Sequence, residues 1–108
     1  MKPIKVIVVG ASGRMGQTIL KKIMSDKSLK LVGATEANNN KYLGIDVGKM
    51  IKSKKIGIDI TDDIEHIFSK ADVVIDFTLP KVTMRHVELA SKNKIFIIIS
   101  LSCSYKFK

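Results

Sequence analysis

The sequence predicts an α/β fold, built as a mostly parallel sheet with flanking helices. Short apolar runs alternate with segments of helical periodicity along most of the chain. The first apolar run leads into a glycine-rich turn, and an acidic residue follows the second run. This order of strand, glycines, helix, strand and acid is typical of Rossmann-type dinucleotide-binding domains.

The first strand is expected over Ile4–Val9, a short β-branched run that ends at a glycine. Residues 10–16 read Gly-Ala-Ser-Gly-Arg-Met-Gly, and residues 14–25 carry apolar side chains at helical spacing. The glycines therefore lie where a strand turns into a helix. In a Rossmann fold this turn binds the pyrophosphate of the dinucleotide.

Each glycine of this turn has a separate expected role. Gly10 allows a tight turn at positive φ, because it has no Cβ. Gly13 leaves room for a phosphate beside free backbone N–H groups, and a left-handed backbone is expected there as well. Gly16 allows the helix to lie close against the strand. The spacing is G-x-x-G-x-x-G, with Ala11 where the commoner G-x-G-x-x-G pattern has glycine. A simple strand-to-helix turn is the alternative, which the order of the elements disfavours.

The second strand is expected over Leu29–Thr35, and Glu36 follows it directly. Glu36 lies 36 − 16 = 20 positions after Gly16, where this fold carries an acid that accepts hydrogen bonds from the adenosine ribose. A solvated loop carboxylate is the alternative for Glu36, but its place at a strand end favours ribose binding. The polar loop over residues 37–41 would then lie near the adenosine.

The remaining residues predict two further strand–helix units. Residues 42–55 form a long connection with at most one short helix, around residues 47–52. The oxygens of Thr61, Asp62 and Asp63 can cap a helix that begins at Ile64. The other expected elements are strands at residues 56–60, 73–78 and 95–99 and a helix at residues 82–93.

The composition indicates one domain, expected over residues 1–99, with a divergent tail over residues 100–108. No apolar run approaches the roughly 20 residues that span a bilayer, which disfavours a membrane protein. The single cysteine, Cys103, excludes an internal disulfide and fits the reducing cytoplasm.

The net charge of +9 raises nucleic-acid binding as a minor alternative. Of the 19 basic residues, only Arg14 and Arg85 are arginines, and the 19 − 2 = 17 lysines are scattered along the chain. Tryptophan is absent, and tyrosine and phenylalanine are few, so aromatic side chains that could stack on bases are scarce. Nucleic-acid partners are therefore disfavoured.

Three motifs in this order resemble those of the bacterial dihydrodipicolinate reductases, also called 4-hydroxy-tetrahydrodipicolinate reductases. Gly10–Gly16 resembles their cofactor loop. Leu43–Gly48, which reads Leu-Gly-Ile-Asp-Val-Gly, resembles their L-G-x-D-x-G loop. Val73–Pro80 contains Asp-Phe-Thr-Leu-Pro and resembles their I-D-F-T-x-P strand end. The resemblance covers about residues 1–99.

The resemblance implies an NAD(P)H-dependent oxidoreductase that reduces a cyclic imine in lysine and diaminopimelate biosynthesis. It implies NADH or NADPH as the cofactor, with Glu36 on the ribose hydroxyls and Phe77 and Thr78 along the path to the nicotinamide. Arg14 would lie near the adenosine side. The pyrophosphate would be held by Gly10, Ala11, Ser12, Gly13, Arg14, Met15 and Gly16.

Two departures from the family pattern limit what is expected of the chain. Residues 100–103 read Ser-Leu-Ser-Cys where the family has G-T-T-G, and the H-H-x-x-K motif of the family's second domain is not found. That domain also carries the surfaces that form the family's homotetramer. We therefore expect a truncated NAD(P)H-binding half that is not catalytic alone, with no catalytic and no metal-binding residues. A non-catalytic dinucleotide-binding or redox-responsive module is the alternative.

Overall fold

The computed structural model describes residues 2–76 and 96–99. Most of the described helices and strands lie where the sequence predicts them. The predicted helix at residues 82–93 lies outside the described residues. In chain order the elements are β1 (Ile4–Val9), α1 (Arg14–Ser25), β2 (Leu29–Thr35), α2 (Val47–Met50), α3 (Ile64–Ile67), the 3-10 turn η1 (Phe68–Lys70), β3 (Val73–Asp76) and β4 (Phe96–Ile99).

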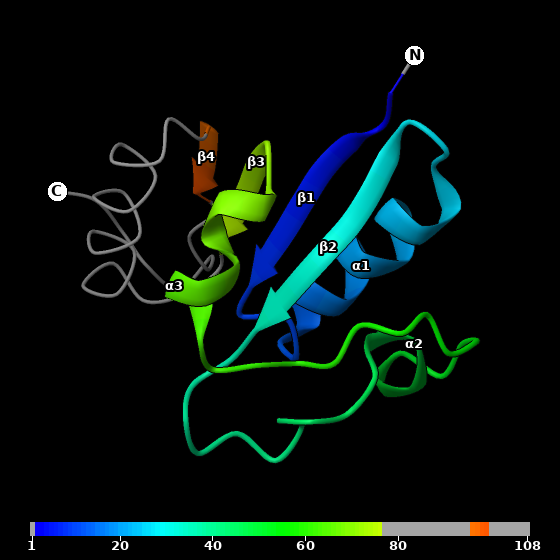
Figure 1. The fold of residues 1–108 in the computed structure, drawn as a ribbon. Coiled ribbons are helices and arrows are strands. Elements are labelled where there is room, and N and C mark those ends of the chain that lie inside the picture. Colours follow the sequence, from blue (N-terminus) through cyan, green and yellow to red (C-terminus); the bar gives the residue numbers. More distant parts are fainter. Residues whose placement is uncertain (1, 77–95, 100–108) are drawn as a thin grey trace, which may run out of the picture.

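The strands form one parallel sheet in the order β2-β1-β3-β4 (Figure 1). β1 lies between β2 and β3, so the chain extends the sheet first on one side of β1 and then on the other. In open parallel sheets a ligand crevice forms outside the carboxyl ends of the strands at such a switch in strand order. The architecture confirms the predicted Rossmann-type α/β fold and places the glycine turn at this switch point.

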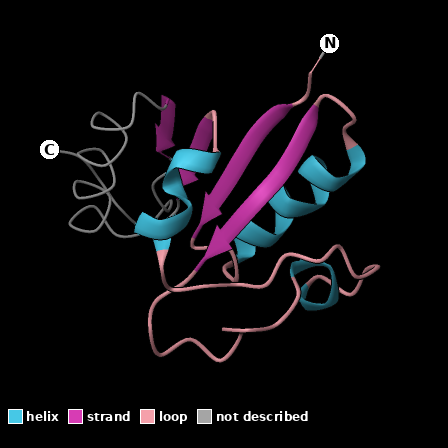
Figure 2. Cartoon of the chain, in the orientation of Figure 1, coloured by secondary structure: helices cyan, strands magenta, loops and turns pink. Residues whose placement is uncertain are grey.

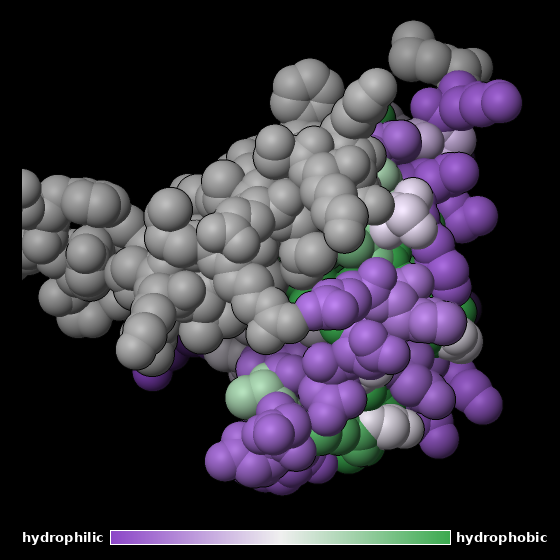
Figure 3. Space-filling view, turned by 60° about the vertical axis from the view of Figure 1, so that its left-hand side comes forward, coloured by the Kyte–Doolittle hydropathy of each residue, from purple (hydrophilic) through white to green (hydrophobic). Residues whose placement is uncertain are grey.

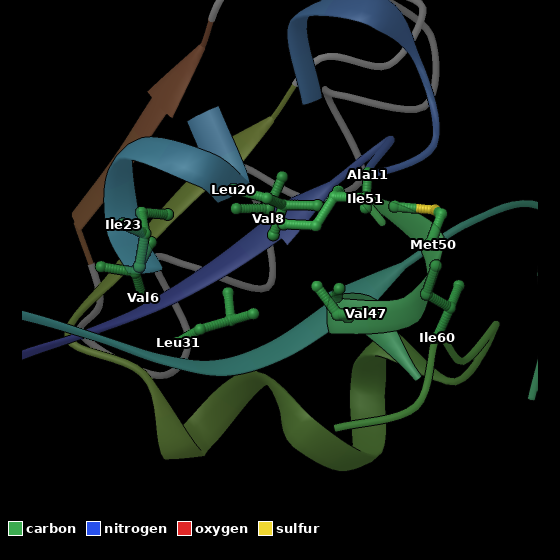
Figure 4. Close-up of a cluster of buried hydrophobic side chains, with 11 residues drawn as sticks. Val6, Val8, Ala11, Leu20, Ile23, Leu31, Val47, Met50, Ile51 and Ile60 are labelled. Carbon is green, nitrogen blue, oxygen red and sulfur yellow. The ribbon is translucent and has the colours of Figure 1, made fainter. Parts of the chain in front are cut away.

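Both faces of β1 are buried over residues 6–9, which explains the uninterrupted apolar run at these residues. Val6 and Val8 pack with Leu20 of α1 on one face. Ile7 and Val9 belong to a second cluster on the other face, together with Phe68. Helices therefore cover the sheet from two sides (Figure 2). The larger cluster also receives side chains from α2 and from the segment after it (Figure 4).

The pairing of β1 with β2 shifts by one residue near its middle. Val6 pairs with Leu31, but Ile7 pairs with Gly33, so Val32 is the extra residue of a bulge. Gly33 has a packing reason as well. A Cβ at this position would lie 2.7 Å from Cδ1 of Ile67, so the missing side chain lets α3 lie against the sheet.

The strand predicted over residues 56–60 is wrong. This segment contains only an isolated bridge between Asp59 and Asp46, and Thr61 forms another with Thr35. The N–H groups of residues 56–58 donate to the carboxylate of Asp46 instead of to a neighbouring strand. The alternating apolar pattern of residues 56–60 therefore does not indicate a strand. The hydrogen-bond acceptor for these N–H groups is the buried side chain of Asp46 and not a sheet.

The described surface visible in Figure 3 is mainly hydrophilic, with small hydrophobic areas between. Ile4, Met15 and Ile45 are the exposed large hydrophobic residues of the described part. No helix in this part of the chain has both the length and the apolar character needed to cross a bilayer.

Candidate functional site

The glycine turn begins directly after β1 and is bound to the end of β2. Gly10 has a φ of 79°, which confirms the predicted tight turn. The N–H groups of Gly10 and Ala11 both donate to the carbonyl of Thr35, at 3.0 and 3.2 Å. These bonds hold the turn at the carboxyl edge of the sheet, beside the residue that follows Thr35.

Gly16 allows a close approach of α1, although to the turn after β1 and not, as the sequence predicts, to the strand itself. It is buried in the first turn of α1, and a Cβ there would lie 2.4 Å from the carbonyl oxygen of Gly10 and 2.7 Å from that of Ala11. Real Cβ atoms do not come so close to backbone oxygens. The helix therefore packs on the carbonyls of the turn itself.

Gly13 has a different environment. It is the N-cap of α1, with φ −68° and ψ 167°, so the left-handed backbone expected there is wrong. A Cβ at Gly13 would meet only the oxygen of Gly10, at an ordinary 3.5 Å. The fold itself therefore has room for a side chain at this exposed position.

The N-terminus of α1 is open. The first N–H groups of an α-helix have no acceptor within the helix, and in the described residues no side chain caps α1 at Gly13. Arg14 and Met15, the first two helical residues, are exposed. The helix spans 12 residues and carries partial positive charge at this end. The arrangement suits a phosphate group.

Glu36 lies beside this turn, although it is 24 positions from Ser12 in the sequence. Its N–H donates to the carbonyl of Thr61, at 3.0 Å, which holds the residue at the end of β2. Its half-buried carboxylate accepts hydrogen bonds through Oε2 from the Ser12 N–H, at 2.7 Å, and from the Ser12 hydroxyl. The predicted ribose acceptor and the predicted phosphate turn are thus in direct contact.

Two amides extend this contact, and sequence reasoning missed both. Asn40 donates through Nδ2 to Ser12 Oγ, at 3.1 Å, and accepts through Oδ1 from the N–H of Tyr42, at 2.8 Å. Gln17 donates through Nε2 to the Ser12 carbonyl, at 2.8 Å. Ser12 therefore joins the turn, helix α1, Glu36 and the loop after β2. The polar composition of residues 37–41 was the only signal for Asn40.

The other predicted cofactor residues either have no hydrogen bond to Glu36 in the described part of the chain or lie outside the described residues. Arg14 is exposed at the start of α1, and its carbonyl accepts a bond from the Thr18 hydroxyl, at 3.0 Å. In the polar loop after β2, which is expected from the sequence to lie near the adenosine, Lys41 lies over the ring of Tyr42, 5.2 Å from its centroid. Phe77 and Thr78 lie outside the described residues. No group of three or more metal-ligating side chains occurs in the described part of the chain.

Asp46 organises the second glycine-containing loop, Leu43–Gly48. The residue is only 5% exposed, and its carboxylate caps α2 by accepting from the Lys49 N–H, at 3.3 Å. It also accepts from the N–H groups of Ile56, Gly57 and Ile58, at 3.1, 2.7 and 3.1 Å. Burial raises the pKa of Asp46, but these backbone donors outweigh burial and hold its pKa below the ordinary value. The carboxylate thus ties the loop to the start of α2 and to residues 56–58.

A comparison with protein families decides the relationship of the chain. The model of the family described as "Dihydrodipicolinate reductase, N-terminus" matches residues 4–101. The chain belongs to this family. The predicted resemblance is confirmed.

Curated relatives agree with this assignment. The 4-hydroxy-tetrahydrodipicolinate reductase of Burkholderia vietnamiensis is 38% identical over 95 residues, and that of Burkholderia multivorans is 39% identical over 95 residues. Each alignment covers 88% of this chain and 36% of the relative. The chain thus spans about a third of the length of these enzymes.

Solved structures share the fold at low sequence identity. The Rex-family repressor RSP in complex with β-NADH has a TM-score of 0.71 at 21% identity, over 99% of this chain and 50% of that one. Aspartate semialdehyde dehydrogenase with NADP from Candida albicans has a TM-score of 0.72 at 14% identity, over 94% of this chain and 30% of that one. These likenesses support the Rossmann-type fold.

Proposed function

We propose that this chain binds NADH or NADPH at the β1–α1 turn, as the nucleotide-binding part of a 4-hydroxy-tetrahydrodipicolinate reductase. One observation carries the proposal: the Glu36 carboxylate is hydrogen-bonded to the turn that opens α1. A carboxylate that accepts from ribose hydroxyls and a helix end that attracts phosphate are therefore neighbours, as the two ends of an adenosine diphosphate moiety require. Family membership gives the same assignment.

Different residues of the site bind different parts of the dinucleotide. The pyrophosphate lies over the turn Gly10–Gly16, where the open N-terminus of α1 supplies backbone donors. Glu36 accepts from the ribose hydroxyls through Oε1, since Oε2 is already occupied by Ser12. Arg14 lies on the adenosine side. Phe77 and Thr78 are assigned to the nicotinamide path from the family resemblance alone.

The same proposal includes the reaction of the whole enzyme. The bound cofactor supplies hydride to a cyclic imine in lysine and diaminopimelate biosynthesis, as in the reductases that share this domain. The present residues 1–99 bind and orient the cofactor, residues 100–108 are a divergent tail, and no residue of this chain is assigned to proton transfer. We place the protein in the cytoplasm, in a homotetramer whose contacts lie on the family's second domain, without a nucleic-acid partner.

Titration calorimetry of the purified chain with NADH and NADPH tests the proposal. We expect both dinucleotides to bind, NADH at least as tightly as NADPH, and no oxidation of NADPH when the imine substrate is added. Binding of neither dinucleotide would contradict the site, and steady NADPH oxidation would contradict the absence of catalysis. A DNA titration at two salt concentrations checks the remaining alternative, because binding to phosphates weakens steeply with salt.

Replacing Glu36 by alanine tests the ribose assignment. The variant should lose on the order of 1–3 kcal/mol of NADH binding, because it loses hydrogen bonds to a charged acceptor. It should lose less NADPH binding, since the carboxylate also repels a 2′-phosphate and Ala37 supplies no cation there. Equal losses for the two dinucleotides would show that Glu36 does not bind the ribose.

A further inference from the structure

Ser12 holds Glu36 in one position. The backbone N–H and the hydroxyl of this single residue both donate to Oε2 of the carboxylate. A carboxylate held by two donors cannot turn away from its place without losing at least one charge-assisted hydrogen bond. The orientation of Glu36 is therefore set by the phosphate turn and not by Glu36 alone.

The Ser12 hydroxyl is itself oriented. It accepts from Nδ2 of Asn40, at 3.1 Å, and so its proton is directed to Glu36. The other end of the Asn40 amide accepts from the N–H of Tyr42, at 2.8 Å, which fixes the amide in this orientation. The four groups form a chain of hydrogen bonds in which each donor has one acceptor, and such chains strengthen their members.

The second oxygen of Glu36 remains available to a ligand. In the described part of the chain, Oε1 accepts a long hydrogen bond, 3.4 Å, from the N–H of Ala37. A ribose 2′-hydroxyl can donate to this oxygen without disturbing the bonds to Ser12. A 2′-phosphate has no such proton at neutral pH and would meet a negative carboxylate that cannot rotate away without losing a hydrogen bond to Ser12.

We propose that Ser12, oriented by Asn40, is a specificity-determining positioning residue that fixes Glu36 to favour NADH over NADPH. The inference rests on the proposed function, since it concerns the same dinucleotide site. It adds a residue to that site whose side chain selects between two cofactors by restraining another side chain. Ser12 acts through Glu36 and needs no contact between its own hydroxyl and the ribose.

Replacing Ser12 by alanine is the central test. The variant keeps the backbone N–H bond but loses the hydroxyl bond, so Glu36 gains freedom to swing away from a 2′-phosphate. The ratio of the NADPH to the NADH dissociation constant should fall roughly three- to tenfold, the value of one hydrogen bond. This ratio does not depend on the fraction of protein that is folded, because both titrations measure the same active fraction.

Three matched variants complete the experiment. Ser12→Thr keeps the hydroxyl and should restore the parent ratio. Asn40→Ala removes the group that orients the hydroxyl and should lower the ratio by a smaller factor. In the Glu36→Ala background, Ser12→Ala should leave the ratio unchanged, because the side chain that it restrains is gone.

The outcomes separate this inference from the proposed function. If the parent binds dinucleotides and Ser12→Ala leaves the ratio unchanged, the inference is wrong and the proposed site stands. The inference is equally wrong if Ser12→Ala shifts the ratio by the same factor with and without Glu36. If the parent binds neither NADH nor NADPH, the proposed function fails and the inference fails with it.

Discussion

The loops at residues 10–16 and 43–48 contain glycines at similar places, but the first leaves the end of a helix uncapped and the second caps it. Each contains a glycine at positive φ, Gly10 at 79° and Gly44 at 81°. Each also has a buried glycine at the start of a helix, Gly16 and Gly48, where a Cβ would collide with a backbone oxygen. The difference lies at the N-cap, which is the bare Gly13 in one loop and the Asp46 side chain in the other.

Under the proposed function, this difference distinguishes the proposed binding loop from the structural loop. The Asp46 carboxylate takes four backbone N–H groups of its own chain, so the loop at residues 43–48 is complete without a partner. In the loop at residues 10–16 the side-chain acceptor is Glu36, which follows β2 and leaves the end of α1 uncapped. Glycine content alone does not distinguish the two loops. The position of the acidic residue does, because Asp46 is itself the N-cap of its helix whereas Glu36 lies outside its loop.

The largest effect is expected from a side chain in the closed loop. In Gly48→Ala the new Cβ would lie 1.8 Å from the carbonyl oxygen of Lys54, so the two segments must separate. We expect the free energy of unfolding to fall by about 3 kcal/mol, measured by urea denaturation. Gly44→Ala is the control, because a Cβ there meets nothing within 4 Å and should cost only about 1 kcal/mol through its backbone strain. Equal losses would contradict the packing argument.

A side chain in the open loop should affect binding and not folding. Gly13→Val has room within the protein, since the nearest atom to its Cβ is at 3.5 Å, but it fills the space assigned to the pyrophosphate. We expect dinucleotide binding to be abolished in calorimetry while the urea midpoint changes little. Gly13→Ala, with a smaller side chain, should retain part of the affinity. Parent-like binding by the valine variant would show that the pyrophosphate lies elsewhere.

Asp46→Asn should reveal a pH-dependent contribution to stability. Because the pKa of Asp46 is lowered in the folded protein, its carboxylate stabilises the fold above the unfolded pKa of about 3.9, and this contribution disappears as the pH falls through the folded pKa. The variant should therefore be less stable than the parent at neutral pH, and the gap should narrow below about pH 4.

Thermal unfolding between pH 3 and pH 7 measures this difference. Asp26→Asn is the matched control, because Asp26 is exposed and its carboxylate accepts from the N–H and the hydroxyl of Ser28, two residues away. Its effect on stability should be smaller at every pH. A gap between Asp46→Asn and the parent that does not change with pH would contradict a role for the charge.

The smallest effect is a gain in stability. Lys52 has a φ of 60° directly after the C-cap of α2, and the bonds from Lys52 N to Lys49 O and from Ser53 N to Gly48 O form a Schellman motif. Glycine is the preferred residue at this position, so Lys52→Gly should stabilise the chain by about 0.5–1 kcal/mol. Lys54→Gly removes the same charge at ordinary φ and should destabilise it slightly. A loss of stability in Lys52→Gly would contradict the strain argument.

Features of the fold that depend on a local sequence pattern could be predicted from the sequence. Buried parallel strands are mostly apolar, which made β1 and β2 recognisable despite Lys5 and Lys30 near their starts. The spacing from Gly16 to Glu36 follows from the length of one helix and one strand. The strand predicted at residues 56–60 failed because alternation is also produced by a segment whose N–H groups bind Asp46. The contacts of Asn40 and Ser12 join residues 28 positions apart, and no local pattern encodes such a contact.

The central position of β1 also bears on how the nascent chain folds. Val6 pairs with Val73, so 73 − 6 = 67 residues separate these partners, and at 5–20 residues per second the ribosome needs roughly 3–13 s to add them. During that interval one edge of the strand Ile-Lys-Val-Ile-Val-Val has no native partner. Such apolar, β-branched edges pair readily with other chains. Slower synthesis between residues 35 and 73 should therefore increase aggregation during expression, and a chaperone that covers apolar strands should reduce it.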